Sequence, residues 1–372
     1  MNNDPKVIDL FSGVGGLSLG AARAGFNVVG AVDSDIKAIS SHSKNFTSTQ
    51  HLCENILKLN GEQLLKKFGV ENIDGIIGGP PCQGFSNMGK QDVNDDRNKL
   101  FIHFFKLVSE IKPKFFLAEN VPGILNSKYD SIRNHAFSQI KDYHILPAFS
   151  VSGVDYGAPT TRTRVFFIGV LDTFKNSIKI DDFDETKLDL KSVIRVKDAL
   201  NGLPEKNEFE EYNIKIEEIV FNSFSYFFSR VTNHVPKSMN GAYLQRYKEK
   251  NIVNGFNKTI HNSEVKHRYS KLKWGETDKI SRSKKLDPLG FAPTLRAGTG
   301  SDKGSYQAVR PIHYFEDRVI TPREAARLQG FPDWFEFDKT IWHSFRQIGN
   351  SVSPLVAEGV LKVVFQKLTS LK

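Results

Sequence analysis

Short apolar runs alternate with helix-forming stretches over roughly the first 170 residues, and this alternation constrains the fold more than any other feature. The apolar runs are rich in Val, Ile and Phe, and they predict buried strands at residues 7–11, 28–33, 73–79, 115–121 and 164–170. The stretches between them have helical patterns at residues 16–24, 35–46, 61–68 and 98–111. Strands alternating with helices predict an α/β fold, a Rossmann-like doubly wound and mostly parallel sheet with helices on both faces.

The rest of the chain is organised differently. Residues 171–310 are polar, turn-rich and irregular, which predicts a second, smaller domain with long loops. We therefore expect a first domain of residues 1–175 that is completed by residues 340–372. The irregular domain and its hinge then span residues 176–339.

Positive charge is concentrated in the irregular part. The chain has 51 Lys and Arg against 42 Asp and Glu, a net charge of +9. Residues 221–290 hold 14 basic and 5 acidic side chains, a net of +9, whereas residues 181–220 hold 6 and 12, a net of −6. Aromatic and amide side chains lie among the basic ones, a mixture suited to phosphate and base-edge contacts. This favours a nucleic-acid partner, although a solvated basic surface would have the same composition.

Cysteine usage and hydropathy limit where such a chain can work. The two cysteines, Cys53 and Cys82, exclude a disulfide framework and indicate a reducing compartment. No run approaches the ~18 apolar residues of a membrane span, and the first residues lack a secretory pattern. We expect a cytoplasmic protein without a membrane partner, in which Cys53 is an ordinary buried cysteine.

A glycine-rich segment follows the first predicted strand and opens the first predicted helix. It reads Phe11-Ser12-Gly13-Val14-Gly15-Gly16, and its glycines allow a tight turn and the close approach of a ligand. Asp33 ends the next strand, 20 residues after Gly13, where a carboxylate can accept hydrogen bonds from ribose hydroxyls. Together these features predict a nucleoside cofactor. The dinucleotide fingerprint is broken, because its third glycine would fall at Ser18.

A cysteine follows two prolines just beyond the strand at residues 73–79. The sequence Gly79-Pro80-Pro81-Cys82 restricts the backbone before the thiol and presents the thiol at the start of a loop. A thiol held in this way is placed as a nucleophile rather than as a core side chain. The polar stretch at residues 87–97 is suited to closing over a substrate.

Charged residues lie at the ends of two more predicted strands. Glu119 follows four apolar residues, so its pKa should rise, and a protonated carboxyl can donate to a ring nitrogen. Arg162 and Arg164 alternate onto one face of the last strand, where they could hold an anion, a carbonyl oxygen or the Glu119 carboxylate. Taken alone, each has a simpler interpretation: a solvent-facing acid, or a charged entry to a strand.

The end of the chain predicts two helices and a turn. Thr321-Pro322-Arg323-Glu324 has the pattern of a helix start, with Thr321 as the cap, and this helix should stop at Gly330. Residues 347–354 contain Gly and Asn and predict a turn that reaches a ligand at the edge of the sheet. An amphipathic helix at residues 354–368 should pack back on the sheet.

A thiolate, a neutral acid and a nucleoside cofactor in a basic protein suit one reaction in particular. Carbon 5 of cytosine is a poor nucleophile until a thiolate adds at carbon 6 while an acid protonates ring nitrogen 3. The resulting enamine can take a methyl group from a sulfonium, and loss of the carbon-5 proton then expels the thiolate. The base must first leave the helix, because a stacked ring offers no face to the thiol.

The ordered motifs resemble those of the DNA cytosine-5 methyltransferases of bacterial restriction–modification systems. The resemblance covers most of residues 7–170 and 290–370, through the segments at residues 11–16, 79–83, 119–121, 162–164, 318–333 and 347–354. It implies an S-adenosylmethionine-dependent methyltransferase fold and methyl transfer to a flipped-out cytosine through a covalent adduct of Cys82. It also implies that residues 176–339 form the target-recognition domain and its hinge.

The resemblance implies a role for each matching residue. Cys82 is the nucleophile, and Glu119 holds ring nitrogen 3 and the exocyclic amine of the cytosine. Arg164 contacts the cytosine carbonyl and steadies Glu119, with Arg162 beside it. S-adenosylmethionine, with no metal, is expected to contact Phe11, Ser12, Gly13, Gly15, Gly16, Asp33, Asn55, Pro80, Leu100 and Asn350. DNA contacts are expected at Ser86, Thr294 and Arg296.

Two positions depart from the family pattern. Thr160 replaces the usual Gln before the arginine pair, so any DNA-backbone contact of that Gln is in doubt. Asn55 replaces the usual acid after the third strand, but an amide oxygen can still accept from the adenine amine. Neither position involves the nucleophile or the acid, so we expect an active enzyme.

The expected partner is double-stranded DNA. Residues 221–290 should lie in the major groove opposite the Cys82 loop, with residues 181–220 facing away. We expect a monomer that works near the nucleoid, and a cognate restriction endonuclease acting separately is the natural companion of such an enzyme.

Three other interpretations stay open. A tRNA cytosine-5 methyltransferase of the same family would share the chemistry, but that branch carries a Cys-Phe-Thr signature that this chain lacks. A catalytically silent DNA-binding regulator is disfavoured by the intact Cys82, Glu119 and Arg164. A dinucleotide-dependent oxidoreductase is disfavoured by the broken glycine fingerprint.

Overall fold

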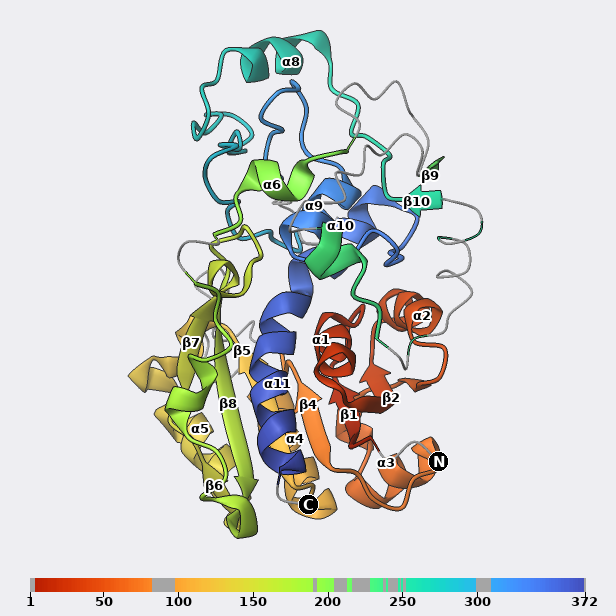
Figure 1. Cartoon of the computed structure of the whole chain (residues 1–372), viewed down its shortest axis with the longest axis vertical. Coiled ribbons are helices and arrows are strands. Elements are labelled where there is room, and N and C mark those ends of the chain that lie inside the picture. Colours follow the sequence, from red (N-terminus) through yellow and green to blue (C-terminus); the bar gives the residue numbers. More distant parts are fainter. Residues whose placement is uncertain are drawn as a thin grey trace.

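The molecule has two ends of different construction. The computed structural model describes residues 4–81, 98–189, 193–203, 213–215, 228–236, 239, 247, 249, 252–298 and 309–370. A sheet covered by helices occupies one end, and irregular segments with short helices occupy the other (Figure 1). The site predicted from the sequence lies where the strands of the sheet meet the irregular end.

Eight strands of the described residues form one mostly parallel sheet. Its order is β3-β2-β1-β4-β5-β8-β6, with β7 also paired to β8. The parallel strands are β1 (Lys6–Leu10), β2 (Asn27–Asp33), β3 (Gln50–Cys53), β4 (Gly75–Gly78) and β5 (Phe115–Asn120). The antiparallel strands are β6 (Tyr143–Ile145), β7 (Phe149–Ser152) and β8 (Thr163–Leu171). The predicted α/β class is confirmed, and the antiparallel edge adds to it.

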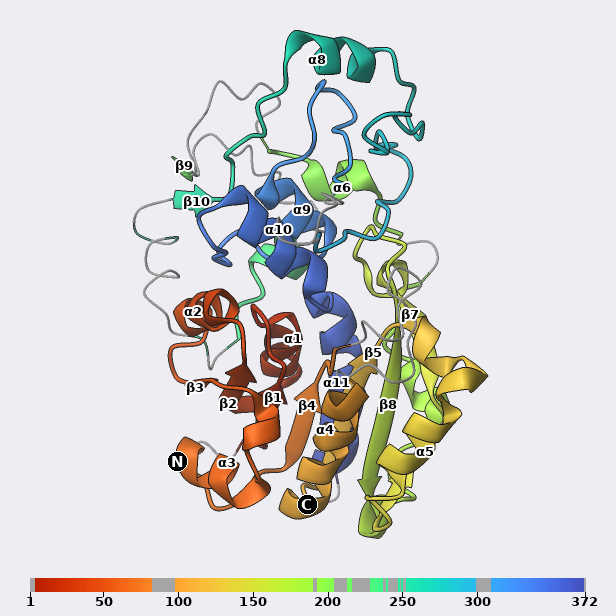
Figure 2. The same ribbon diagram turned by 180° about the vertical axis from the view of Figure 1, so that it is seen from behind.

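Helices cover both faces of the sheet, and each face has its own apolar cluster. One cluster contains α1 (Gly16–Ala24) and α11 (Pro354–Thr369), and the other contains α3 (Gly61–Phe68), α4 (Asn98–Ile111) and α5 (Asp130–Phe137). Figures 1 and 2 show these two layers from opposite sides. The ranges predicted for α1, α3 and α4 are confirmed, and α2 (Ile36–Asn45) is one residue shorter at each end than predicted. Short 3-10 turns lie at Ile56–Lys58, Pro122–Leu125, Ser127–Tyr129, Gly153–Tyr156, Asp172–Phe174 and Ile180–Phe183.

Helix α11 is the central helix of its layer. Gly20 of α1 allows the close packing, because a Cβ there would lie 2.3 Å from the Ala357 Cβ and 2.6 Å from the Glu358 nitrogen. The stretch Ile341–Thr369 is long and apolar enough to cross a membrane by length and composition, but 83% of its most apolar window is buried in the molecule. It also comprises two helices, α10 (Ile341–Asn350) and α11, so it is part of the protein core.

The turn predicted at residues 347–354 is only partly a turn. Residues 347–350 form the last turn of α10, and the chain bends at Ser351 before α11 begins at Pro354. Neither Gly349 nor Asn350 has a positive φ, so no left-handed turn forms there. Helix geometry rather than a glycine turn therefore places Asn350.

The irregular end is built from short elements. These are α6 (Val196–Leu200), β9 (Asn213–Lys215), a π-helical turn (Phe228–Thr232), β10 (Ile252–Asn254), α8 (Ser263–Ser270) and α9 (Pro322–Leu328). Thr321 and Glu324 form the predicted capping box of α9, and Gly330 has φ +83° just beyond its end. The domain boundaries at residues 175/176 and 339/340 stay a prediction.

Candidate active site

One cavity of about 490 Å³ lies beyond the carboxyl ends of β1, β2, β4 and β5. It brings together most of the residues singled out from the sequence. Those that line it are Phe11, Ser12, Gly13, Asp33, Asn55, Pro80, Leu100, Glu119, Arg162, Arg164 and Asn350. Gly15, Gly16, Thr294 and Arg296 do not line it. Cys82 and Ser86 lie outside the described residues.

The glycine-rich loop is held open by its backbone conformation. Phe11, Gly13 and Gly15 have φ values of 63°, 55° and 103°. The Gly13 amide donates to Asp33 Oδ2 at 2.8 Å, and the Asp35 amide donates to Asp33 Oδ1 at 2.9 Å. Burial raises the pKa of Asp33 despite these bonds. The loop and Asp33 therefore form one hydrogen-bonded unit at the cavity wall.

The Ser12 hydroxyl lacks a hydrogen-bond partner among the described residues. The Ser12 side chain is buried in the cavity wall. A buried hydroxyl without a partner is costly, so a polar ligand in the cavity would satisfy it. The cavity wall thus fits a bound molecule with hydrogen-bonding groups.

Gly15 and Gly16 lie on the side of the loop that packs against the protein interior. A Cβ on Gly16 would lie 2.2 Å from both Ser351 Oγ and the Val352 carbonyl oxygen. A side chain at position 16 would push the turn between α10 and α11 away. These two glycines therefore allow the loop to pack closely against the residues behind it. Their predicted contact with the cofactor stays a prediction.

Apolar side chains form part of the cavity wall, next to Glu54 and Asn55. These side chains are those of Pro80, Ile56 and Leu100. Asn55 Oδ1 accepts the Leu57 amide at 3.0 Å and caps a 3-10 turn. That bond uses one acceptor site of the amide oxygen and leaves one for a ligand. The predicted adenine contact of Asn55 stays a prediction.

Glu119 and Arg164 form the charged pair expected from the sequence. Arg164 Nε lies 2.6 Å from Glu119 Oε1, and both side chains are largely shielded from solvent. Burial raises the pKa of Glu119, whereas Arg164 and Arg162 lower it, and burial is the larger effect. The carboxyl is thus held in place and kept easier to protonate than a solvated acid.

The segment before Cys82 approaches this pair closely. A Cβ on Gly79 would lie 3.0 Å from Glu119 Oε2, so a side chain at position 79 would press on the carboxyl. Asn120 Nδ2 donates to the Pro80 carbonyl at 3.3 Å and ties the proline pair to β5. Pro81, which immediately precedes Cys82, lines the cavity.

Arg162 connects the sheet to the irregular end. Its Nη1 donates to the Leu295 carbonyl at 3.1 Å, between Thr294 and Arg296. Thr160 is fully buried and pairs with Ala292 as an isolated parallel bridge. Thr160 therefore contributes to an internal junction, a position that the sequence alone did not reveal.

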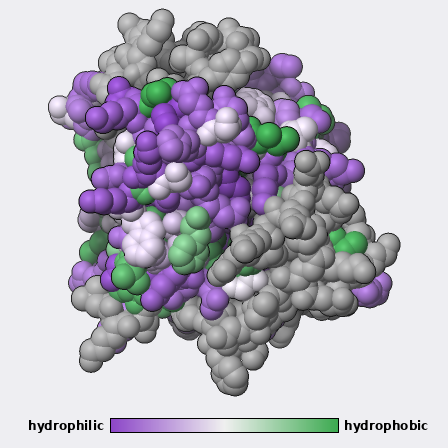
Figure 3. Space-filling view, turned by 90° about the horizontal axis from the view of Figure 1, so that it is seen from above, coloured by the Kyte–Doolittle hydropathy of each residue, from purple (hydrophilic) through white to green (hydrophobic). Residues whose placement is uncertain are grey.

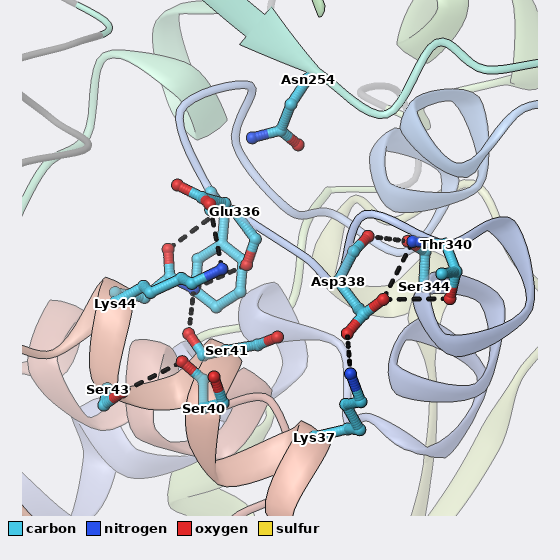
Figure 4. Close-up of polar contacts among 12 residues, drawn as sticks. Lys37, Ser40, Ser41, Ser43, Lys44, Asn254, Glu336, Asp338, Thr340 and Ser344 are labelled. Carbon is cyan, nitrogen blue, oxygen red and sulfur yellow. Dashed lines mark hydrogen bonds and ion pairs between the residues drawn. The ribbon is translucent and has the colours of Figure 1, made fainter. Parts of the chain in front are cut away.

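Three basic residues line the cavity and were not predicted: Lys37, His343 and Arg346. Figure 4 shows how α2 joins the segment that carries two of them: Lys37 pairs with Asp338, and Lys44 pairs with Glu336. Such contacts join residues about 300 positions apart in the chain, so no local pattern could indicate them.

Cys53 is not the buried cysteine that the sequence suggested. It is exposed at the end of β3. Its strand is the outermost of the sheet, where alternate side chains face solvent. Among the described residues, no group of three or more His, Cys, Asp or Glu side chains could hold a metal ion.

The fold and this cavity define an α/β protein with a ligand-sized cavity at the strand ends and a buried acid–arginine pair inside it. Residues 5–366 match the family model of the C-5 cytosine-specific DNA methylases, and the chain belongs to this family. It is 35% identical to the type II methyltransferase M.XorII of Xanthomonas oryzae over 96% of this chain and 83% of that protein. It is 32% identical to M.DdeI of Desulfomicrobium norvegicum over 95% and 87% of the two chains.

Solved structures agree with this assignment. A crystal structure assigned as a DNA modification methyltransferase from an E. coli prophage is 48% identical, with a TM-score of 0.87, covering 98% of this chain and all of that one. The Dnmt2 methyltransferase of S. pombe shares the fold, with a TM-score of 0.65 at 18% identity over 98% and 99% of the chains. The protein is thus a DNA cytosine-5 methyltransferase related to the type II enzymes of restriction–modification systems.

Proposed function

We propose that this protein transfers the methyl group of S-adenosylmethionine to carbon 5 of a flipped-out cytosine in a specific DNA sequence. The observation that carries the proposal is the Glu119–Arg164 pair at 2.6 Å inside the cavity. A buried, positioned carboxyl with a raised pKa is what protonation of ring nitrogen 3 requires. A sulfonium cofactor supplies the methyl group when bound.

The cofactor would lie along the glycine-rich loop. Asp33 would hold the ribose, and Ser12 would gain the partner that its buried hydroxyl lacks. Leu100 and Pro80 would contact the adenine, with Asn55 accepting from its amine. Asn350 would lie at the methionine end.

Cys82 would act as the nucleophile. Its thiolate adds to carbon 6 of the cytosine while Glu119 gives a proton to ring nitrogen 3, and Arg164 keeps the carboxyl in position. After the methyl group reaches carbon 5, that carbon loses its proton and the carbon–sulfur bond breaks. Glu119 takes back the proton from ring nitrogen 3, and the enzyme regains its thiolate.

The irregular end would recognise DNA. The face that carries α8 is mostly hydrophilic with scattered apolar side chains (Figure 3), and the residues around it belong to the basic stretch at residues 221–290. Thr294 and Arg296 would contact DNA next to the Arg162 junction, and Ser86 would do so from the opposite side. We further propose a cytoplasmic monomer that protects host DNA from a separate endonuclease.

Methyl transfer assays test this function directly. Tritium should pass from labelled S-adenosylmethionine to duplex DNA and not to tRNA, and bisulfite sequencing of DNA from expressing cells should place it at one sequence. The Cys82→Ala variant should bind the cofactor nearly as well as wild type but transfer no methyl group. Transfer to tRNA alone would indicate the tRNA branch, and no transfer by wild type would indicate a silent regulator.

A further inference from the structure

Four polar side chains beneath the glycine-rich loop form a continuous chain of hydrogen bonds. Ser18 Oγ lies 2.6 Å from Asp9 Oδ2 and 3.0 Å from His42 Nε2. His42 Nδ1 lies 2.8 Å from His51 Nε2. Asp9, Ser18 and His42 are buried, whereas His51 is partly exposed. The chain therefore leads from a buried carboxyl to the protein surface, and the proposed reaction assigns it no role.

This chain directly supports the loop that faces the cavity. A Cβ on Gly15 would lie 3.0 Å from His42 Cδ2, so the loop rests on the imidazole ring. Asp9 lies two residues before Phe11, and the charge of Asp33 raises its pKa through the protein interior. Asp33, His42 and His51 are thus the titratable groups that lie against or along this chain. A change of charge at Asp9 would therefore change the electrostatic potential at the cavity wall.

Asp9 is poised to change charge near neutral pH. Burial raises its pKa to about 7, although the bond from Ser18 opposes this effect. Its Oδ1 has no hydrogen-bond partner among the described residues, which adds to the cost of ionising it. Burial lowers the pKa of both His42 and His51, so both rings are neutral at that pH. A neutral imidazole donates from one nitrogen and accepts at the other.

The four side chains can therefore be linked by hydrogen bonds in two arrangements. With Asp9 ionised, Ser18 donates to Asp9, His42 donates from Nε2 to Ser18, and His51 donates to His42 Nδ1. With Asp9 protonated, every donor and acceptor exchanges, so that Asp9 donates to Ser18 and His42 donates from Nδ1 to His51. A proton leaving Asp9 thus arrives at the partly exposed His51 ring, which passes it to solvent.

We propose that Asp9, Ser18, His42 and His51 form a proton relay that adjusts the charge beneath the cofactor loop. Asp9 ionises when the cationic sulfonium cofactor binds and is reprotonated when only the neutral thioether product remains. The relay then favours substrate over product, because only S-adenosylmethionine carries the sulfonium charge. The part of this inference that concerns the cofactor rests on the proposed function.

The relay itself can be tested on the cofactor-free protein. Nitrogen-15 NMR of the histidine rings, recorded on both sides of pH 7, should show His42 changing from its Nδ1–H form to its Nε2–H form as Asp9 ionises. Ser18→Ala should abolish this change, and Ser43→Ala on the exposed side of α2 should preserve it. A single His42 tautomer across the whole range in wild type would overturn the relay.

Calorimetry in buffers of different ionisation enthalpy tests the link to the cofactor. Near pH 7, wild type should release more protons on binding S-adenosylmethionine than on binding S-adenosylhomocysteine, and Asp9→Asn should lose this excess. Comparing the two proteins cancels the titration of the cofactor's own ammonium group. The affinity ratio of substrate to product should rise with pH, up to about tenfold for each unit by which the sulfonium lowers the Asp9 pKa.

The outcomes separate the two proposals. If wild type and Asp9→Asn release the same excess of protons on binding S-adenosylmethionine, the role of Asp9 is overturned. Failure of wild type to bind either molecule would instead overturn the proposed function. If Asp9→Asn does not fold, Ser18→Ala serves as the second variant. The extra proton release on binding S-adenosylmethionine should then occur at higher pH, because the bond that lowers the Asp9 pKa is lost. An unmoved excess in that variant would also contradict the role of Asp9.

Discussion

At the scale of single residues, the site depends on opposing effects at Glu119. Burial raises its pKa, and the Arg164 guanidinium opposes the shift while fixing the carboxyl geometry. A carboxyl that must donate a proton is active in its protonated form. The rate of adduct formation should therefore fall as pH rises through this raised pKa.

Replacing the acid tests this role. Glu119→Gln should slow adduct formation with a 5-fluorocytosine duplex by about 10²- to 10⁴-fold, because the amide cannot supply the proton. Single-turnover kinetics would measure the rate, and Glu62→Gln on the exposed side of α3 is a matched control. An unchanged rate in Glu119→Gln would refute the assignment.

The sequence predicted some residue contacts and missed others for a physical reason. The partnership of Glu119 with Arg164 could be predicted, because their strands carry complementary charges at the ends where ligands bind. The burial of Thr160 depends on its backbone pairing with Ala292, more than 100 residues further along the chain. Side-chain chemistry alone cannot indicate such partners.

At the scale of elements, local signals determined which boundaries could be predicted. Helix α3 begins with a capping box at Asn60 and Gln63 and ends at Gly69 with φ +63°. Local residue types therefore predict both of its ends. Strands β6 and β7 have three and four residues, which is too short for a pattern to show. Helix α10 was not predicted, and its last turn was obscured because Gly349 and Asn350 also suit turns.

The contact between α1 and α11 yields a prediction at this scale. Gly20→Ala should destabilise the protein by about 1–3 kcal/mol, since the added methyl group meets backbone and Cβ atoms of α11 that cannot move independently. Chemical denaturation would measure this change. Lys66→Ala on the exposed side of α3 is the control, because it shortens an exposed side chain and introduces no new contact. Equal losses in the two variants would contradict the close helix packing.

At the scale of the whole molecule, a buried charge cluster fastens the irregular end to the sheet domain. Glu358 of α11 lies 2.9 Å from Arg230 Nη1 and 4.0 Å from Arg23 Nη1. Arg23 also donates from Nε to the His234 carbonyl, at 3.2 Å. Residues 228–236 were expected to belong to the recognition domain, and these contacts join them to α1 and α11.

Removing the central acid should weaken this junction. Glu358→Gln should lower the free energy of unfolding by about 3–5 kcal/mol, because it leaves the buried Arg23 guanidinium without a counter-charge. Asp142→Asn breaks the exposed pair with Lys112 and should have little effect. Similar denaturation midpoints for Glu358→Gln and wild type would contradict a structural role for the cluster.

The covalent bond to the base is the most direct test of the account. A duplex that contains 5-fluorocytosine at the target position should trap the enzyme when S-adenosylmethionine is present, since fluorine replaces the hydrogen that must leave carbon 5 as a proton. Mass spectrometry of the digested complex should place the DNA on Cys82 and leave Cys53 unmodified. An adduct on any other residue, or methyl transfer that persists in Cys82→Ala, would contradict the account.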